Sequence, residues 1–422
     1  MTAPTDNALG LYISIPFCRA KCTYCNFASG VYPASEHAPY VDRLIEDRRL
    51  AADWAARMNV ELPRIVDTVY LGGGTPSLLA PKLLKRLFGA MRANFDLEPD
   101  AEVTVECAPG QIADEMLEAF QAVGVNRVSL GVQSFIDREA QASGRLHSRE
   151  KVEEDLRRLR KAGIANLSVD LIAGLAGQTS ATWEESLAVL LDLGVPHASV
   201  YMLEVDEDSR LGREMLSGGV RYYAELVPVD DAIAQMYSRA IERLAHAGLE
   251  QYEISNFCLP GFKSRHNLRY WERRPYLGLG LDASSMLREA LPAASRAEPR
   301  NVLRTTTTSD LGEFVEGSAP VETAWLSPAR QLEEAWFLGL RLNRGISRSA
   351  LEREFGRESV APAIAVVGRL VEDKLLTSDG ETVRLTAQGR LLSNDVFQEF
   401  LGLDSGELQH CSPRNRQSLL SR

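Results

Sequence analysis

The sequence predicts an α/β fold with a mainly parallel sheet, followed by a small C-terminal unit. From residue 11 to about 205, short β-type runs alternate with segments of helical periodicity. Three of the helical segments end in a glycine turn just before the next strand, at Gly124, Gly163 and Gly194, and glycine is the residue that most often ends a helix. Strands that alternate with helices pair in parallel through right-handed crossovers. The residues alone leave two architectures open, a doubly wound sheet and an open (β/α)6 barrel.

Six strand–helix units account for the first half of the chain. The expected strands are 12–15, 68–71, 102–106, 127–132, 167–172 and 198–203, and the expected helices are about 37–59, 82–94, 112–123, 149–162 and 181–193. In either architecture, ligands gather at the carboxyl ends of the strands. The residues that follow each strand are therefore the ones to inspect for chemistry.

The second half of the chain is expected to complete the barrel and add one further domain. We expect a helix at about 229–247, a β-type run at 251–257 and a barrel domain that extends to residue 286. Residues 287–327 resemble a linker or irregular excursion, because Pro, Ser and a threonine run interrupt any period. Residues 328–402 predict a winged-helix-like domain with an Asp379-Gly380 hairpin turn, and residues 403–422 are expected to be a flexible tail.

Composition limits the class of partner. The chain has 422 residues with a net charge of −11, and 329–401 carries ten Lys and Arg against eleven Asp and Glu. Nucleic-acid binding needs clustered cations, so we expect no nucleic-acid partner even for the winged-helix-like domain. No apolar run is long enough to span a bilayer, and residues 1–10 do not resemble a signal peptide. We therefore expect a cytoplasmic protein without a transmembrane segment.

Three cysteines follow the first expected strand. Cys18, Cys22 and Cys25 have the spacing Cys-x3-Cys-x2-Cys within one short loop. Thiolates hold iron–sulfur clusters, usually four to a cluster, so a set of three leaves one iron open to another ligand. The alternatives are a structural zinc site, which usually takes four ligands, and three unrelated buried cysteines.

Glycines and polar residues follow the next four strands. Gly72-Gly73-Gly74-Thr75-Pro76 comes after the second strand, and glycine lets a backbone approach a ligand closely. Glu106 ends the third strand and Gln133 the fourth, while Asp170 lies within the fifth. Arg145 follows Gln133 and offers a planar fork for a carboxylate. Alone, each residue is more often a cap or a surface ion pair, but together they indicate one common site.

The motifs resemble those of the radical S-adenosylmethionine (SAM) superfamily. The carrying segments are LYISIPFCRAKCTYCNF, GGGTP, VECAPG, NRVSLGVQSF, SGRLH and SVDLIAGLAGQT, and the likeness extends over about residues 10–400. Within the superfamily, the chain is most similar to the oxygen-independent coproporphyrinogen III oxidase-like branch, and there to the HemW haem chaperones. The resemblance favours the open (β/α)6 partial barrel of this superfamily over the doubly wound sheet.

The resemblance also implies cofactors and the residues that hold them. It implies a [4Fe–4S] cluster on Cys18, Cys22 and Cys25, whose open iron binds SAM, and it implies haem as a further ligand. The implied SAM contacts are Tyr12, Tyr24, Gly73, Gly74, Thr75, Glu106, Gln133, Arg145 and Asp170. Within RHNLRYW, His266 is the candidate axial ligand of haem, while Cys258 and His410-Cys411 are weaker candidates.

Two features favour the chaperone over the oxidase. The oxidase pattern has a fourth cysteine where this chain has Phe27, and it has a long extension before the cluster loop where this chain has 17 residues. A chaperone of this family would pass haem to apo-haemoproteins, which the resemblance suggests are respiratory proteins at the membrane. The competing hypotheses are a coproporphyrinogen III oxidase that uses a 5′-deoxyadenosyl radical, and a non-redox protein with zinc in the cysteine loop.

Some positions depart from the family pattern. Ser14 replaces a usual histidine, and Ala176 replaces a common proline. Asp282 and Ser285 lie in LDASS, where Pro-Gly-Ala-His-Ser is more usual. These changes put the geometry of the porphyrin site in doubt, but they leave the cluster and SAM positions unaffected.

Overall fold

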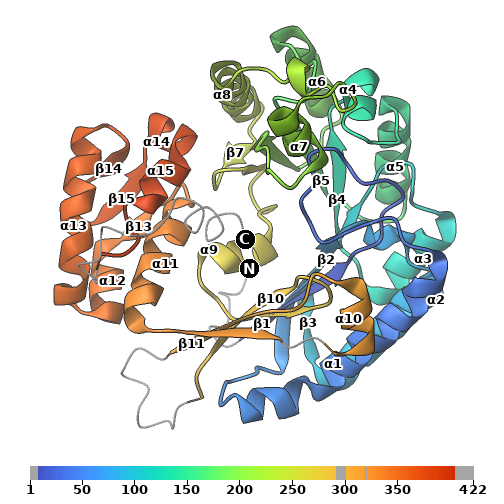
Figure 1. Cartoon of the computed structure of the whole chain (residues 1–422), viewed down its shortest axis with the longest axis horizontal. Coiled ribbons are helices and arrows are strands. Elements are labelled where there is room, and N and C mark those ends of the chain that lie inside the picture. The colour runs from blue at the N-terminus through green and yellow to red at the C-terminus, as the bar shows by residue number, and fades with distance from the viewer. Residues whose placement is uncertain (1–7, 291–300, 319–320, 404–422) are drawn as a thin grey trace.

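A computed structural model describes residues 8–290, 301–318 and 321–403. Its main feature is a curved sheet of twelve strands in the order β12-β11-β10-β9-β1-β2-β3-β4-β5-β6-β8-β7 (Figure 1). The six central strands run parallel. These strands are β1 (Leu9–Ile15), β2 (Ile65–Gly73), β3 (Asp96–Cys107), β4 (Arg127–Gln133), β5 (Asn166–Ala173) and β6 (His197–Met202). Because β6 and β1 do not pair with each other, the barrel is open, as the family resemblance implied.

Helices connect the strands, and most of them cover the outer face of the sheet. They are α1 (His37–Arg57), α2 (Pro81–Asn94), α3 (Asp114–Val123), α4 (Asp137–Ala142), α5 (Arg149–Lys161), α6 (Ser180–Asp192), α7 (Arg210–Ser217) and α8 (Asp230–His246). Short 3-10 turns occur at Ala34–Glu36, Pro76–Leu78 and Ala224–Leu226. The sequence did not predict α4 and α7, because each is too short to show a helical period.

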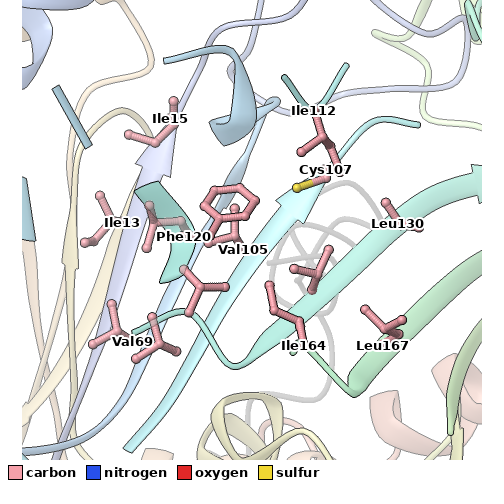
Figure 2. Packing of buried hydrophobic residues seen from close by; sticks show 14 of the residues in the cluster. Ile13, Ile15, Val69, Val105, Cys107, Ile112, Phe120, Leu130, Ile164 and Leu167 are labelled. Carbon is pink, nitrogen blue, oxygen red and sulfur yellow. The ribbon is translucent and has the colours of Figure 1, made fainter. Parts of the chain in front are cut away.

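Strand alternation separates the core from the barrel interior. In β1, Leu11, Ile13 and Ile15 are fully buried in the large core under the helices, while Tyr12 and Ser14 point the other way, since successive side chains alternate. Figure 2 shows the outer layer, in which the strand side chains Ile13, Val69, Val105 and Leu130 pack with helical residues such as Phe120. The polar residues that remain on the inner face therefore share one lumen.

The structure corrects the expectation that residues 287–327 form a linker or irregular excursion. They continue β10 (Ser284–Arg288) and contribute β11 (Val302–Thr306), α10 (Leu311–Glu316) and β12 (Glu322–Leu326). The three strands pair antiparallel and extend the sheet beyond β9 (Tyr276–Leu279), which itself runs parallel to β1. At the opposite edge, β7 (Glu250–Gln251) and β8 (Asn256–Cys258) pair antiparallel.

The C-terminal domain has a core of its own. It contains α11 (Pro328–Leu340), β13 (Ile346–Ser347), α12 (Arg348–Phe355), α13 (Arg357–Glu372), the hairpin β14 (Leu376–Ser378) and β15 (Thr382–Leu385), α14 (Ala387–Leu391) and α15 (Ser393–Gln398). Trp336 stacks on Phe400 with ring centroids 4.9 Å apart. Three helices and a hairpin agree with the predicted winged-helix-like unit, although its last expected helix is two short ones. The predicted tail, apart from Leu403, lies outside the described residues.

No helix in the described ranges is both long enough and apolar enough to cross a membrane.

Candidate functional site

The cysteine loop and the GGGTP turn lie against each other at the carboxyl ends of β1 and β2. The backbone N–H of Gly74 donates to the carbonyl of Ile15 at 2.9 Å, and that of Thr75 donates to the carbonyl of Phe17 at 2.8 Å. A Cβ atom on Gly74 would lie 2.7 Å from the Ile15 oxygen and 2.9 Å from the Phe17 oxygen. Only glycine allows this approach, so the turn forms a close-fitting support beneath the loop.

The three thiols point to polar groups of neighbouring segments. The Thr75 hydroxyl donates to Cys18 Sγ at 3.9 Å, and Arg145 Nη1 donates to Cys22 Sγ at 3.4 Å. Cys25 Sγ lies 4.0 Å from the Ser29 hydroxyl. All three cysteines are free thiols, as are the other two cysteines of the described chain. The donors nearby suit thiolate ligands, which are the deprotonated form that binds metal.

Burial opposes thiolate formation at one of these cysteines. It raises the pKa of the Cys18 thiol, and hydrogen bonds from Ser29 and Thr75 oppose that rise. Within the described ranges, no three His, Cys, Asp or Glu side chains are close enough to hold one metal ion. An iron–sulfur cluster makes a different demand, because each thiolate binds a different iron.

Two carboxylates face the barrel lumen behind the cysteine loop. Tyr70 donates its hydroxyl to Glu106 Oε1 at 2.7 Å, and Ser129 donates to both oxygens of Asp170 at 3.0 and 3.2 Å. Burial raises the pKa of Glu106 to about 7, and the nearby charge of Asp170 adds to the rise. Burial also raises the pKa of Asp170, against hydrogen bonds from Ser199 and Ser129.

Two further lumen residues leave buried polar atoms unpaired. Arg145 Nη2 donates to the carbonyl of Gly131. However, two buried atoms, Nε of Arg145 and Oε1 of Gln133, have no hydrogen-bond partner in the described part of the chain. Gln133 also holds a left-handed φ of 71°, a conformation that non-glycine residues adopt mainly where the surroundings impose it. A donor and an acceptor left unpaired beside a thiol loop fit a ligand that carries amino and carboxylate groups, as SAM does.

The remaining predicted contacts join the same site. Tyr12 faces the lumen from β1 and stacks on Tyr70 with ring centroids 6.2 Å apart. Tyr24 lies close enough to Arg145 and Cys22 for their charges to affect its pKa, which burial raises well above its usual value. The structure therefore brings all twelve predicted cluster and SAM residues to the carboxyl ends of β1 to β5.

His266 lies toward the amino-terminal ends of the strands, where its ring stacks on that of Tyr70 with ring centroids 5.2 Å apart. It belongs to α9 (Arg265–Trp271), which lies near the centre of the curved sheet in Figure 1. Its Nδ1 is 2.9 Å from Thr68 Oγ1, and its Nε2 is 2.8 Å from the Tyr270 hydroxyl. Thr68 precedes Gly73 by five residues of β2, which corresponds to about 16 Å at roughly 3.3 Å per residue.

The environment of His266 is that of a structural histidine. The side chain has no exposed surface, and burial lowers the pKa of the imidazole well below its usual value. The Glu102 carboxylate accepts the N–H groups of Arg265 and His266 at 3.0 Å each, and so caps the helix. Ligation of haem iron by His266 therefore stays a prediction that requires α9 to release a ring nitrogen.

Cys258, one of the weaker haem candidates, is not near the cysteine loop. Cys258 is buried in β8, opposite His197 of β6, and His410-Cys411 lie outside the described residues. Among the departures from the family pattern, Ser14 accepts a hydrogen bond from Tyr40 through its carbonyl at 2.7 Å. The Ser285 hydroxyl accepts the Gly278 N–H at 3.0 Å. Both serines are thus part of the packing around β1 and β9.

Arg127 is a lumen residue that sequence reasoning missed. Its side chain is buried, with an overall exposure of 2%, and its charge opposes the rise in the pKa of Glu106 and of Asp170. Its Nε has no hydrogen-bond partner among the described residues. The available signal was an arginine at the start of a strand whose alternate residues, Ser129 and Gln133, face the lumen.

Comparison with known proteins identifies the family. The radical SAM superfamily model matches residues 12–190, and the HemN C-terminal domain model matches residues 326–392. The chain is 34% identical to the haem chaperone HemW of Lactococcus lactis (92% of this chain, 96% of that protein). It is 30% identical to HemW of Escherichia coli (93% and 98%).

Two further matches extend the comparison. The chain is 31% identical to the mitochondrial radical S-adenosyl methionine domain-containing protein 1 of Bos taurus (94% of this chain, 88% of that protein). The structure of the coproporphyrinogen III oxidase HemN of E. coli has the same fold, with a TM-score of 0.78 at 21% identity over 93% of this chain and 90% of that chain. The chain therefore belongs to the HemW family of radical SAM proteins.

Proposed function

We propose that this protein is a haem chaperone that holds a [4Fe–4S] cluster on Cys18, Cys22 and Cys25. One observation carries the cluster and SAM part of the proposal. Three free thiols lie over a glycine turn. Nearby, a buried acceptor on Gln133 and a buried donor on Arg145 have no hydrogen-bond partner in the described chain. The haem part rests on the names of the relatives, which are described as haem chaperones.

The lumen residues would bind SAM at the open iron. The Gly73–Thr75 backbone, Glu106 and Gln133 Oε1 would receive its amino group, and Arg145 would bind its carboxylate. Asp170 would bind the ribose hydroxyls, and Tyr12 and Tyr24 would provide further contacts. When bound, the cluster and SAM supply one-electron chemistry, and the protein supplies orientation and exclusion of water. Arg145 can hold both a thiolate and a carboxylate because its guanidinium has five donors.

The cluster proposal can be tested by anaerobic reconstitution with iron and sulfide. We expect close to four irons and four sulfides per chain, and a change in the electron paramagnetic resonance spectrum of the reduced protein when SAM is added. A Cys22→Ser variant should lose the cluster, whereas Cys107→Ser, at a buried cysteine of β3, should keep it. Zinc without labile sulfide would instead favour the zinc hypothesis.

Haem transfer and catalysis can be separated in one set of assays. For a chaperone, we expect stoichiometric haem binding followed by transfer to an apo-cytochrome. Anaerobic incubation with coproporphyrinogen III, SAM and a reductant should give no multiple-turnover formation of protoporphyrinogen. Catalytic turnover would overturn the chaperone proposal in favour of the oxidase. Respiratory apo-haemoproteins are the proposed recipients and the cytoplasm the proposed location, since cluster thiolates need reducing conditions.

A further inference from the structure

One connection exposes an unusual amount of apolar surface. Residues 215–229, between β6 and α8, carry six of the fifteen exposed large apolar side chains of the described chain. These six are Met215, Leu216, Val220, Tyr223, Leu226 and Val229, with exposed fractions from 47% to 75%. Scattered single residues of this kind are ordinary, but a group on one short connection is typical of a binding surface. We name these six residues the α7 surface.

The α7 surface adjoins the mouth of the barrel. The Leu211 N–H donates to the carbonyl of Thr23 at 2.9 Å, and Arg210 Nη1 donates to the carbonyl of Lys21 at 3.1 Å. Asn26 Nδ2 donates to Asp206 at 3.1 Å. Figure 1 shows α7 beside the loop that follows β1. The start of α7, just before the α7 surface, is therefore next to the cysteine loop, and this connection follows the carboxyl end of β6.

A buried carboxylate holds this connection in shape. Glu214 is only 7% exposed, and its two oxygens accept the backbone N–H groups of Arg221, Tyr222 and Ala224 at 2.9 to 3.2 Å. These bonds fold the chain after α7 back against the helix. The surface is thus preformed, which lowers the entropy lost when a ligand binds.

The charges around the α7 surface favour a ligand with carboxylates. Between Ser209 and Val229 the exposed charged residues are Arg210, Arg213, Arg221 and Glu225. The Arg221 guanidinium lies 5.4 Å from the centroid of the Tyr222 ring. Acidic residues at 206–208 and at 230–231 flank the connection. They would repel an extended anionic bilayer, whereas a small ligand can place its carboxylates at the arginines alone.

We propose that the α7 surface binds one face of a tetrapyrrole, and that Arg213 and Arg221 bind its propionates. A tetrapyrrole is a flat apolar molecule with carboxylates at one edge, and arginine pairs with carboxylates through two parallel hydrogen bonds. The inference rests on the proposed function, in which haem is the ligand. It assigns haem to the barrel mouth rather than to α9.

Haem titration of full-length, anaerobically purified protein tests the α7 surface. A Met215→Ser/Leu216→Ser variant should bind haem at least about tenfold more weakly than the unmodified protein. The matched control is Val371→Ser/Leu392→Ser, which removes two exposed apolar side chains from the C-terminal domain and should bind haem normally. All four side chains are exposed, so the melting temperatures should stay close to that of the unmodified protein.

The role of the arginines has a separate readout. An Arg213→Gln/Arg221→Gln variant should lose affinity for haem but bind haem dimethyl ester, which lacks free propionates, as well as the unmodified protein does. Equal losses for haem and for its ester would overturn the arginine assignment.

The outcomes separate this inference from the proposed function. If the unmodified protein fails to bind haem, the proposed function fails, and the inference fails with it. If it binds haem and the Met215/Leu216 variant binds equally well, the α7 surface alone is overturned. If that variant keeps haem but loses flotation with phosphatidylcholine/phosphatidylglycerol vesicles, the surface contacts membranes and our assignment is wrong.

Discussion

The carboxyl group of Glu106, at the proposed SAM site, changes its protonation state near neutral pH. Burial raises its pKa to about 7, and it faces Tyr70 of β2, Tyr12 of β1, Arg127 of β4, Asp170 of β5 and Tyr201 of β6. The carboxyl group is thus mostly protonated at pH 6 and mostly ionised at pH 8. Only the ionised form can pair with the amino group of SAM.

We therefore predict that SAM affinity rises about tenfold from pH 6 to pH 8, because the ionised fraction of a group with a pKa of about 7 rises by that factor. Equilibrium dialysis under anaerobic conditions measures it. Glu106→Gln should bind more weakly and lose most of the pH dependence, whereas Glu118→Gln, exposed on α3, should behave like the unmodified protein. If Glu106→Gln leaves the pH dependence of SAM affinity unchanged, another group is responsible for that dependence.

At the scale of single residues, the sequence predicted the site wherever a motif marks a strand end. Cys18, Cys22 and Cys25 could be found from spacing alone, and Glu106 and Asp170 from their positions on expected strands. Tyr70 could not, since it lies within a strand and its importance comes from Glu106 on another strand. Arg127 was marked only weakly, by its place at the start of a strand. Strand alternation indicates which face a residue occupies, but not which side chains meet across a barrel.

The GGGTP turn is the element whose backbone most constrains the cysteine loop. Adding a methyl group at Gly74 would press on two carbonyl oxygens, those of Ile15 and Phe17, at 2.7 and 2.9 Å. We predict that Gly74→Ala moves the loop away from the turn and lowers cluster occupancy after reconstitution, measured as iron and sulfide per chain.

Gly89→Ala is the matched control for Gly74→Ala. Gly89 lies within α2, and nothing would meet its added methyl group within 4 Å. Alanine in a helix is favoured over glycine by roughly 1 kcal/mol, so the control should be as stable as the original or more so and should load the cluster fully. Full loading of Gly74→Ala would show that the loop tolerates the shift.

The RHNLRYW motif forms α9, and two of its side chains anchor this helix to the barrel. Arg269, also fully buried, donates to the carbonyls of Ala8 and Pro275 at 2.9 and 2.8 Å and forms an ion pair with Asp67. Together with His266, it fastens α9 to β1 and β2. The sequence could not reveal this position, because a motif does not indicate at which end of a barrel a later helix packs.

We predict that His266→Ala lowers the free energy of unfolding by about 1–3 kcal/mol, because Thr68 and Tyr270 each lose a buried hydrogen-bond partner. Urea unfolding measures this loss. At a temperature where the variant is folded, its haem titration should match that of the unmodified protein. A weaker or spectrally altered haem complex in a folded variant would instead support His266 as an axial ligand.

At the scale of the whole molecule, the sequence predicted the parallel half of the sheet better than its edges. The buried strands β1 to β6 carry a regular local pattern, and the structure confirms them. The edge strands β11 and β12 were expected to be a linker. Their order comes from pairing with β10 and with each other, a long-range effect that a local period cannot show. In β12 all but one residue is exposed, so burial leaves almost no pattern to read.

A bidentate ion pair connects one of these strands, β11, to the C-terminal domain. Arg304 of β11 donates through Nε and Nη2 to the two carboxylate oxygens of Glu334 on α11, at 3.2 and 2.7 Å, and both side chains are mostly buried. Another ion pair joins the C-terminal domain to the residue that follows α9. It links Arg344 to Glu272 over 2.8 Å, but its arginine is 66% exposed. Exposed pairs contribute at most about 1 kcal/mol, while charged hydrogen bonds away from water contribute roughly 1.5–3 kcal/mol.

We therefore predict that Glu334→Gln lowers the free energy of unfolding by about 1–3 kcal/mol, and that Glu272→Gln lowers it by less than about 1 kcal/mol. Both can be measured by urea unfolding at low ionic strength. High salt should reduce the loss in free energy of unfolding caused by Glu272→Gln more than the loss caused by Glu334→Gln, because salt screens exposed charges first. Equal losses in the two variants would mean that the buried bidentate geometry contributes nothing beyond an ordinary surface pair. Other contacts, such as the ion pair between Arg273 and Glu354, would then hold the domain to the barrel.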